Sequence, residues 1–209
     1  MSIIFEAIFN KGGMMNKTDK LKNMLQNGIV TATAMKKENI PSSIMTILVK
    51  KGEAKRLARG VYATSEAGFS DMSDYEALAA NTDGIFCLIS ALRLHGLTDE
   101  NPHDLCMAIK RGYHPPRHCH IPITIIYRTR TYPDSVEIRH SHGVALRIYT
   151  VEQTIADCFQ YRNKIGLDVA VSALKDAVRQ QKVDWNKLWE AAKRCRVTKI
   201  MRPYMEAIS

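Results

Sequence analysis

Hydroxyl and cationic side chains gather on one face of a short predicted helix and in the segment that follows it. On the predicted helix they recur at a spacing of three or four residues, and they are Ser42, Ser43, Thr46 and Lys50. Four more cations follow in the next nine positions: Lys51, Lys55, Arg56 and Arg59. Hydroxyl groups can hydrogen-bond base edges, and cations can neutralise phosphates or enter a minor groove. The chemistry that this group predicts is non-covalent recognition of double-stranded DNA, with Ser43 and Thr46 at base edges and the cations at phosphates.

Three short helices and a two-stranded ribbon, expected between residues 18 and 64, would hold these side chains in place. Thr18 is the expected N-cap of the first helix. The third helix should pack on the first two through an apolar stripe made of Ile44, Ile47 and Leu48. A hairpin over 54–63 then carries three of the cations near its turn. This order of elements is typical of a winged helix-turn-helix, in which one helix enters the major groove. The alternative is a small helical domain of the same build that only contacts other proteins.

The distribution of charge favours the nucleic-acid interpretation. The 209-residue chain has a formal net charge of +9. Residues 1–70 hold 11 Lys and Arg against 5 Asp and Glu, whereas residues 71–209 hold 19 against 16. Most of the excess positive charge therefore lies in the first third of the chain, as expected of a domain that binds nucleic acid.

Composition limits the class of protein. With 45% hydrophobic and 24% charged residues, the chain is typical of a globular protein rather than of a disordered one. Its five cysteines are scattered and include no CxxC, which indicates a reducing, cytoplasmic setting in which they pack in the core. No apolar run approaches the length of a membrane span, so no membrane association is expected. The composition does not indicate an oligomeric state.

The small, polar segment SEAGFSD at 65–71 is predicted to link two domains, which we place at 1–66 and 72–209. After the linker the pattern predicts two helices, about four strands and then four helices. Because helices and strands are segregated rather than alternating, the fold class expected is α+β, with an N-terminal winged helix-turn-helix and a C-terminal domain built on a roughly four-stranded sheet.

Two segments of the second domain carry a resemblance to a known family. The sequences LISALRLHGLT (88–98) and YTVEQTIADCF (149–159), with Pro102 between them, resemble the AbiEi-type antitoxin domain, and ARGVYAT (58–64) is similar to the end of that family's N-terminal DNA-binding domain. The resemblance covers about residues 18–209. It implies a transcriptional autorepressor that binds operator DNA and counters a nucleotidyltransferase-type toxin of a bacterial abortive-infection system, with or without direct contact between the two proteins. It offers no catalytic residues to transfer.

The antitoxin surface is expected among the basic C-terminal helices, because they form the largest exposed single-sign feature of residues 71–209. The residues predicted for it are Lys187, Arg194 and Lys199. Two alternatives stay open. One is a plain winged-helix repressor whose second domain senses a ligand or forms a dimer, and the other is a nuclease that uses the N-terminal domain for targeting.

Other constellations give weaker signals. The His-rich segment at 113–120 and the pair His140 and His142 match no standard zinc spacing, so no metal site is expected. Asp134 and Glu137 would point to opposite faces of one strand, which disfavours a nuclease centre. Asp157, in an apolar helical setting, is expected to be a buried hydrogen-bonding centre, and His95 a cation at a helix end. No cofactor motif and no catalytic set are present, so enzyme activity is not expected.

Overall fold

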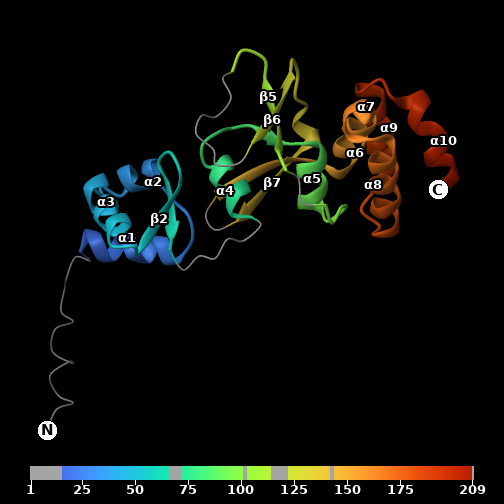
Figure 1. Ribbon diagram of the computed structural model, residues 1–209. Coiled ribbons are helices and arrows are strands. Elements are labelled where there is room, and N and C mark those ends of the chain that lie inside the picture. Colours follow the sequence, from blue (N-terminus) through green and yellow to red (C-terminus); the bar gives the residue numbers. More distant parts are fainter. Residues whose placement is uncertain (1–15, 66–71, 101–102, 114–121, 142–143, 209) are drawn as a thin grey trace, which may run out of the picture.

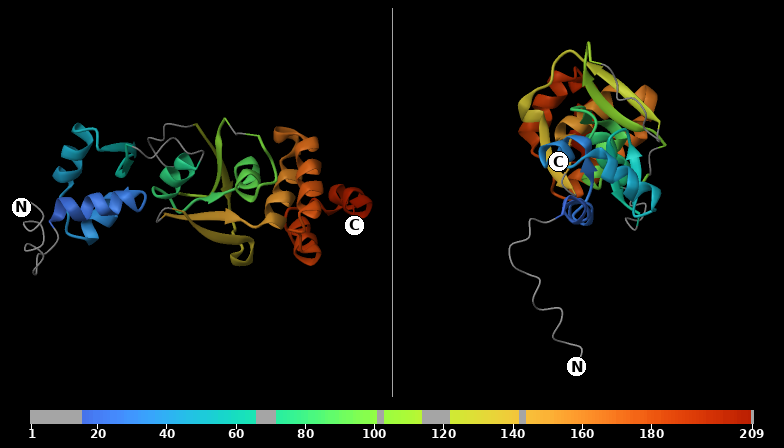
Figure 2. Two further views of the ribbon diagram at one scale, coloured as in Figure 1. Left: turned by 90° about the horizontal axis from the view of Figure 1, so that it is seen from below. Right: turned by 90° about the vertical axis from the view of Figure 1, so that its left-hand side faces the viewer.

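The computed structural model describes residues 16–65, 72–100, 103–113, 122–141 and 144–208 (Figure 1). Figures 1 and 2 show the N-terminal helices at one end of the molecule, a second sheet in the middle and the C-terminal helices at the other end. The fold is α+β, as the sequence predicted, and the described residues contain ten α-helices and two sheets of three and five strands.

The first part contains three helices and a three-stranded antiparallel sheet. In chain order its elements are α1 (Lys17–Gln26), β1 (Val30–Thr31), α2 (Ala32–Lys37), α3 (Ser42–Lys50), β2 (Ala54–Ala58) and β3 (Val61–Thr64). The expected hairpin is β2 and β3, but β1 pairs with the free side of β3 and gives the order β1-β3-β2. A two-residue strand has too few positions to show alternation, which is why the sequence did not indicate β1.

Local hydrogen bonds set the helix ends in this part. Asn16, not Thr18 as predicted, is the N-cap of α1, and its side chain accepts from the backbone N–H of Thr18. Thr31 caps α2 by accepting from Ala34 N–H at 3.0 Å. The predicted apolar stripe of α3 is wrong in one position: Met45 and Leu48 are buried in the apolar cluster that also contains Leu21 of α1, whereas Ile47 faces outward.

The second sheet has five strands rather than about four. Its order is β6-β5-β4-β8-β7, formed by β4 (Ile85–Phe86), β5 (Leu105–Lys110), β6 (Ile123–Arg128), β7 (Val136–Ser141) and β8 (Val144–Tyr149). The strands β5 and β6 are parallel, as are β4 and β8, while β4–β5 and β7–β8 are antiparallel. A short 3₁₀ turn, Pro133–Ser135, precedes β7, and helix α4 (Ser73–Ala79) covers one side of the sheet with Tyr75 and Leu78.

The missed strand is β4, since the spacing of Ile85, Leu88, Ile89 and Leu92 predicts one helix that begins directly after Gly84. Ile85 and Phe86 are both buried because β4 lies in the middle of the sheet, so their spacing cannot distinguish a strand from a helix. Helix α5 (Leu88–His95) begins only after Cys87. Gly84 is required just before β4, since a Cβ there would collide with the side chain of Met107.

The sequence predicted four C-terminal helices, at 151–161, 167–180, 184–195 and 197–208, and the structure has these four and one more, of four residues. They are α6 (Val151–Gln160), the short α7 (Arg162–Ile165), α8 (Leu167–Arg179), α9 (Trp185–Arg194) and α10 (Thr198–Ile208). Together with α5 they enclose the largest apolar cluster, which includes Ile155, Phe159 and Leu174. The spacing of Thr150 and Gln153 predicts a capping box at the start of α6. Thr150 does cap the helix by accepting from Gln153 N–H, but the Gln153 side chain turns inward to Asp157 and does not complete the box.

A small apolar cluster joins the first part to the second. Val61 of β3, which is buried, packs with Ala77 of α4, and Ile29, Leu57 and Ala80 lie around them. The predicted linker falls mostly on residues outside the described ranges, as do the N-terminal 15 residues and most of the His-rich segment. The covalent linker is therefore not the only connection between the two parts.

Two further expectations concern the burial of the cysteines and the presence of membrane-spanning helices. The four cysteines within the described ranges, Cys87, Cys106, Cys158 and Cys195, are all buried with free thiols, as predicted for core residues. Of the helices that the structure describes, none combines the length and the apolar character needed to cross a bilayer.

Candidate functional site

Helix α3 presents a continuous outer face on the side opposite its packing contacts. Ser43, Thr46, Ile47 and Lys50 are all exposed, and their i, i+3, i+4, i+7 spacing aligns them along one side of the helix. Ser42 is exposed beside them at the first turn, where its carbonyl accepts from the hydroxyl of Thr46 at 3.2 Å. The structure thus brings together all four predicted residues of this helix, and it adds an isoleucine to them.

The position of α3 is fixed from three sides. Met45 and Leu48 anchor it in the apolar cluster shared with α1, and Pro41, in an extended conformation, precedes its first residue. At the other end Gly52 has φ +74°, a conformation that glycine adopts without steric cost, and the backbone N–H of Glu53 returns to the carbonyl of Leu48. The outer face is therefore carried by a rigid element.

The predicted cations follow directly after this face. Lys50 and Lys51 end α3, and Lys55 and Arg56 lie on β2. Arg59 is exposed at the turn between β2 and β3, where Gly60 takes φ +72° and its carbonyl accepts from Ala32 N–H at 2.7 Å. Because that hydrogen bond ties the turn to the start of α2, the hairpin keeps a fixed position beside the helices.

Two lysines of α1 form ion pairs with carboxylates of this part. Lys22 lies 2.7 Å from Glu53 and Lys20 lies 2.5 Å from Glu38. The hydrogen bond from Lys22 lowers the pKa of Glu53, and Lys51 acts in the same direction through its charge. These two acids therefore pair with lysines of α1.

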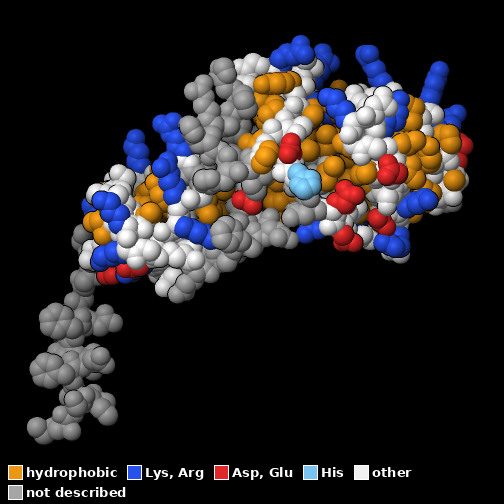
Figure 3. Space-filling model, viewed as in Figure 1, with side chains coloured by type: hydrophobic (Ala, Val, Ile, Leu, Met, Phe, Trp, Pro, Cys, Tyr) orange, Lys and Arg blue, Asp and Glu red, His pale blue; other side chains and the backbone are white. Residues whose placement is uncertain are grey.

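A second group of cations, which sequence reasoning missed, lies at the ends of β5 and β6. These strands are parallel and in register, so Lys110 is opposite Arg128, and Arg111 N–H donates to the carbonyl of Arg128 at 2.8 Å. Arg130 is exposed two residues further on. Figure 3 shows Lys and Arg side chains along its upper edge, above β5 and β6 as well as above the N-terminal helices, whereas Asp and Glu lie lower. The signal that could have found this group is the shared edge at which two parallel strands end.

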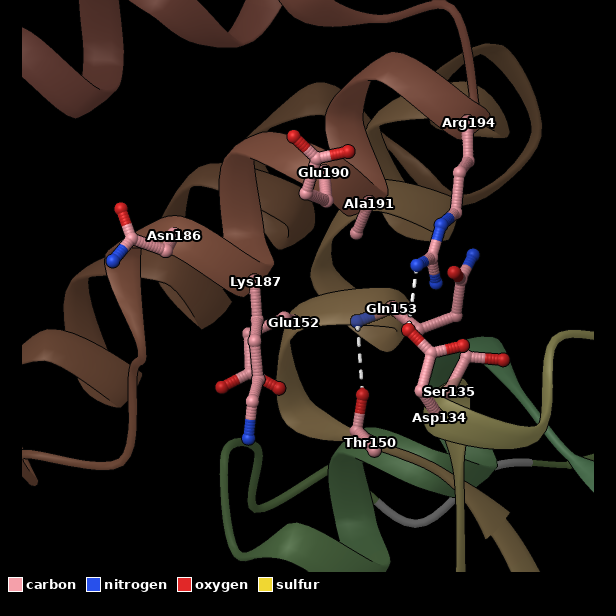
Figure 4. Close-up of a pocket in the computed structure, with 10 residues that line it drawn as sticks. All are labelled: Asp134, Ser135, Thr150, Glu152, Gln153, Asn186, Lys187, Glu190, Ala191 and Arg194. Carbon is pink, nitrogen blue, oxygen red and sulfur yellow. Dashed lines mark hydrogen bonds and ion pairs between the residues drawn. The ribbon is translucent and has the colours of Figure 1, made fainter.

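The predicted C-terminal surface is not of a single sign. Lys187 and Arg194 line the same cavity of about 150 Å³, but Asp134, Glu152 and Glu190 line it too (Figure 4). Lys199 is exposed on α10, outside this lining. The antitoxin surface was placed here because the helices were expected to expose cations alone, and this is wrong for the cavity. The assignment of the three residues stays a prediction.

Arg194 is committed to an ion pair. Its guanidinium lies 2.5 Å from Asp134 and 4.5 Å from the centre of the Tyr132 ring. Figure 4 shows the side chain extending from α9 to Asp134 across one end of the cavity. The hydrogen bond from Arg194 lowers the pKa of Asp134. Asp134 belongs to the 3₁₀ turn rather than to the strand of Glu137, so the two acids do not share an element as predicted.

Asp157 is the buried hydrogen-bonding centre that the sequence predicted. Its carboxylate has no exposed surface, accepts from Gln153 Nε2 at 2.9 Å and pairs with Arg128 at 2.5 Å. Burial, together with the charge of Asp157, raises the pKa of Cys195 to about 12, so this thiol stays protonated and donates to Asp157. Burial also raises the pKa of Asp157, and Arg128 acts against this shift. The cluster is structural, because it links α6 to strand β6 through Arg128 and to the end of α9 through Cys195.

His95 is buried, and it is not the helix-end cation that was predicted. Its Nδ1 accepts from the guanidinium of Arg139 at 2.8 Å, so Nε2 carries the proton and donates to the carbonyl of Tyr149 at 2.7 Å. Burial lowers the pKa of the imidazole, with Arg139 and Lys182 acting in the same direction and Glu137 against it. Lys182 instead supplies the cation at the end of α5, by donating to the His95 carbonyl at 2.6 Å.

The ranges that the structure describes contain no group of three His, Cys, Asp or Glu side chains arranged to hold a metal ion. Most of the His-rich segment lies outside those ranges.

Comparison with known proteins gives a likeness of fold. No family model matches the sequence. No curated protein matches it. Among solved structures, the crystal structure of the RV2827C protein from Mycobacterium tuberculosis is similar, with a TM-score of 0.59 and 14% sequence identity over 84% of this chain and 69% of that one. At this identity the likeness concerns the fold alone, and the chain shares its arrangement of helices and sheets with that protein.

Proposed function

We propose that the chain is a DNA-binding transcriptional regulator whose residues 16–65 act as a winged helix-turn-helix. In this proposal α3 is the recognition helix and the β2–β3 hairpin is the wing. The single observation that supports it best is the outer face of α3, where Ser43, Thr46 and Lys50 stand in line with no other described element packed over them. A helix of this kind fits the major groove of B-form DNA.

The roles within the interface follow from side-chain chemistry. Ser42, Ser43 and Thr46 carry hydroxyl groups, which donate to and accept from base edges. Lys50, Lys51, Lys55, Arg56 and Arg59 neutralise phosphates, and Arg59 does so from the turn at the tip of the wing. In the same proposal the exposed cations at the ends of β5 and β6, which are Lys110, Arg111 and Arg130, contact flanking phosphates.

The test of DNA binding uses the purified full chain. It is incubated with a pool of duplexes that contain a random central segment, and the bound duplexes are amplified and sequenced. The proposal expects enrichment of one sequence, to which the chain binds with an affinity that falls steeply as salt rises. A pool that stays random, together with no retention of any duplex at low salt, would exclude the proposal.

For the second part we propose an antitoxin role against a nucleotidyltransferase-type toxin, a role that rests on the resemblance of segments 88–98 and 149–159. These segments contact each other, since His95 donates to the carbonyl of Tyr149, and most of their residues are buried. In this proposal the two segments serve as framework, and the surface that meets the toxin is left to experiment. The test first identifies whether the adjacent gene encodes a nucleotidyltransferase that arrests growth, and co-expression of the chain with that toxin should restore growth.

The two alternative functions, a plain repressor and a nuclease, predict different results in these experiments. A plain repressor would bind DNA without protecting cells, and its cavity beside Arg194 or a dimer contact would carry the regulation. A nuclease would cleave DNA when a divalent metal is supplied. The proposal assigns no reaction and no cofactor to the chain, and it expects intact DNA after incubation with Mg²⁺ or Mn²⁺.

A further inference from the structure

Ile47 is the one large apolar side chain on the outer face of α3. It is 51% exposed, whereas Met45 and Leu48 on the opposite side are buried and Ile44 and Val49 are partly buried. A single exposed isoleucine is common on protein surfaces and needs no explanation by itself. This one differs in its place, because Ser43 and Lys50 lie one turn before and one turn after it on the same face.

The major groove offers one apolar group to such a side chain. Each thymine presents its C5-methyl group there, and neither cytosine nor a purine presents one. Hydroxyl groups can satisfy the polar edges of neighbouring bases and an ammonium group can bind a phosphate, so an isoleucine set between them would face a methyl group without leaving a polar atom unpaired. The branched side chain also has a strongly preferred rotamer in a helix, so fixing it on DNA costs little conformational entropy.

We propose that Ile47 reads a thymine by packing on its methyl group, so that the preferred site contains a T·A pair at the position α3 meets between the contacts of Ser43 and Lys50. The inference rests on the proposed DNA-binding function and adds a residue that determines specificity. Ser43 and Thr46 read the polar edges beside it, while Lys50 binds the backbone.

Uracil substitution isolates the methyl group. In the duplex that the full chain selects from a random pool, each thymine is replaced in turn by deoxyuridine, which removes only the C5-methyl. Replacement at one position, or at its symmetry mate, should weaken binding by the wild-type chain about three- to fivefold, as expected for losing one buried methyl group. The other replacements should have no comparable effect.

The variant Ile47→Ala, measured on the same two duplexes, completes a double-mutant cycle between the side chain and the methyl group. It should bind the thymine and uracil duplexes with equal affinity, and since Ile47 is half exposed the variant should keep the wild-type circular dichroism spectrum and thermal midpoint. The matched control is Lys50→Ala on the same face, which should weaken binding to both duplexes and keep the thymine-to-uracil ratio.

Each outcome separates the two proposals. If the wild-type chain binds no duplex, the DNA-binding function itself fails. If it binds a defined sequence but no thymine is sensitive to uracil, or if Ile47→Ala keeps the wild-type ratio at the sensitive position, the assignment of Ile47 is overturned while DNA binding stands.

Discussion

The guanidinium of Arg128, at the end of edge strand β6, lies 2.5 Å from the carboxylate of Asp157, which is fully buried in α6. Two further side chains, Gln153 and Cys195, donate to the same carboxylate. The pair therefore joins the five-stranded sheet to the C-terminal helices, and it couples strand β6 to a cluster in which α9 ends.

Asp157→Ala should lower the free energy of unfolding by about 3–5 kcal/mol, because it leaves the Arg128 charge and two donors without their acceptor. Chemical denaturation followed by circular dichroism measures this. The matched control is Asp134→Ala, which breaks the Arg194 ion pair at the surface and should change stability only slightly. Equal losses of unfolding free energy in the two variants would refute the claim that Asp157 holds the sheet and the C-terminal helices together.

The buried imidazole of His95 gives stability a predictable dependence on pH. Burial lowers its pKa in the folded chain, so as pH falls below about 6.5 the unfolded chain takes up a proton that the folded chain does not. The contribution is therefore present above about pH 6.5 and is lost as pH falls towards the folded pKa. His95→Gln keeps a donor for Tyr149 and an acceptor for Arg139 but cannot be protonated, so its stability should fall less than that of the wild type between pH 7 and pH 5. His140→Gln, on the exposed face of β7, should follow the wild type, and an unaltered slope in His95→Gln would contradict the prediction.

The cations at the ends of β5 and β6 should take part in DNA binding without reading sequence. Replacing both Lys110 and Arg111 by Ala should weaken binding to selected and random duplexes alike and reduce the slope of log K against log salt by about two. The control replaces Lys175, an exposed cation on α8, and should leave the slope unchanged. A loss confined to the selected sequence would mean that these residues contact bases instead.

The sequence predicted much of this fold because its strongest signals are local. The four C-terminal helices and the polar face of α3 follow from spacing and caps. The apolar residues of α3, however, fill two overlapping stripes, so the pattern cannot decide whether Met45 or Ile47 is buried. The assembled apolar cluster, which contains Met45 and not Ile47, decides it. Strand β4 was missed because a two-residue buried strand has no period.

At the candidate sites, the sequence could not predict side-chain pairs whose members lie far apart in the chain. The position of Asp157 was correctly predicted to be a buried centre, but its partner Arg128 lies on another element and has no local signal. Arg194 was counted as a free surface cation, and it is held by Asp134, 60 residues earlier. Pairings of this kind depend on the assembled fold, and helix-face arguments do not reveal them.

The two parts should separate with only a partial loss of function. Residues 71–209 contain both large apolar clusters of the second part and should unfold cooperatively and still protect cells from the toxin. Residues 1–70 should retain weaker DNA binding, because separation exposes Val61 and removes the cations of β5 and β6. The measurement is co-expression of each fragment with the toxin, scored for growth, in parallel with gel retardation. Loss of protection by a fragment that is folded by circular dichroism would show that the two parts act as one unit.

The central claim is that α3 and its hairpin bind DNA with a division between base contacts and phosphate contacts, and titration of two variants by fluorescence anisotropy tests it most directly. Arg59→Ala should weaken binding to the selected and random duplexes alike and reduce the salt slope by about one. Thr46→Ala should keep that slope and lose preference at one base pair, at a cost of about 1–3 kcal/mol on the selected duplex. Isotherms of both variants that overlay the wild type at every salt concentration would contradict the account.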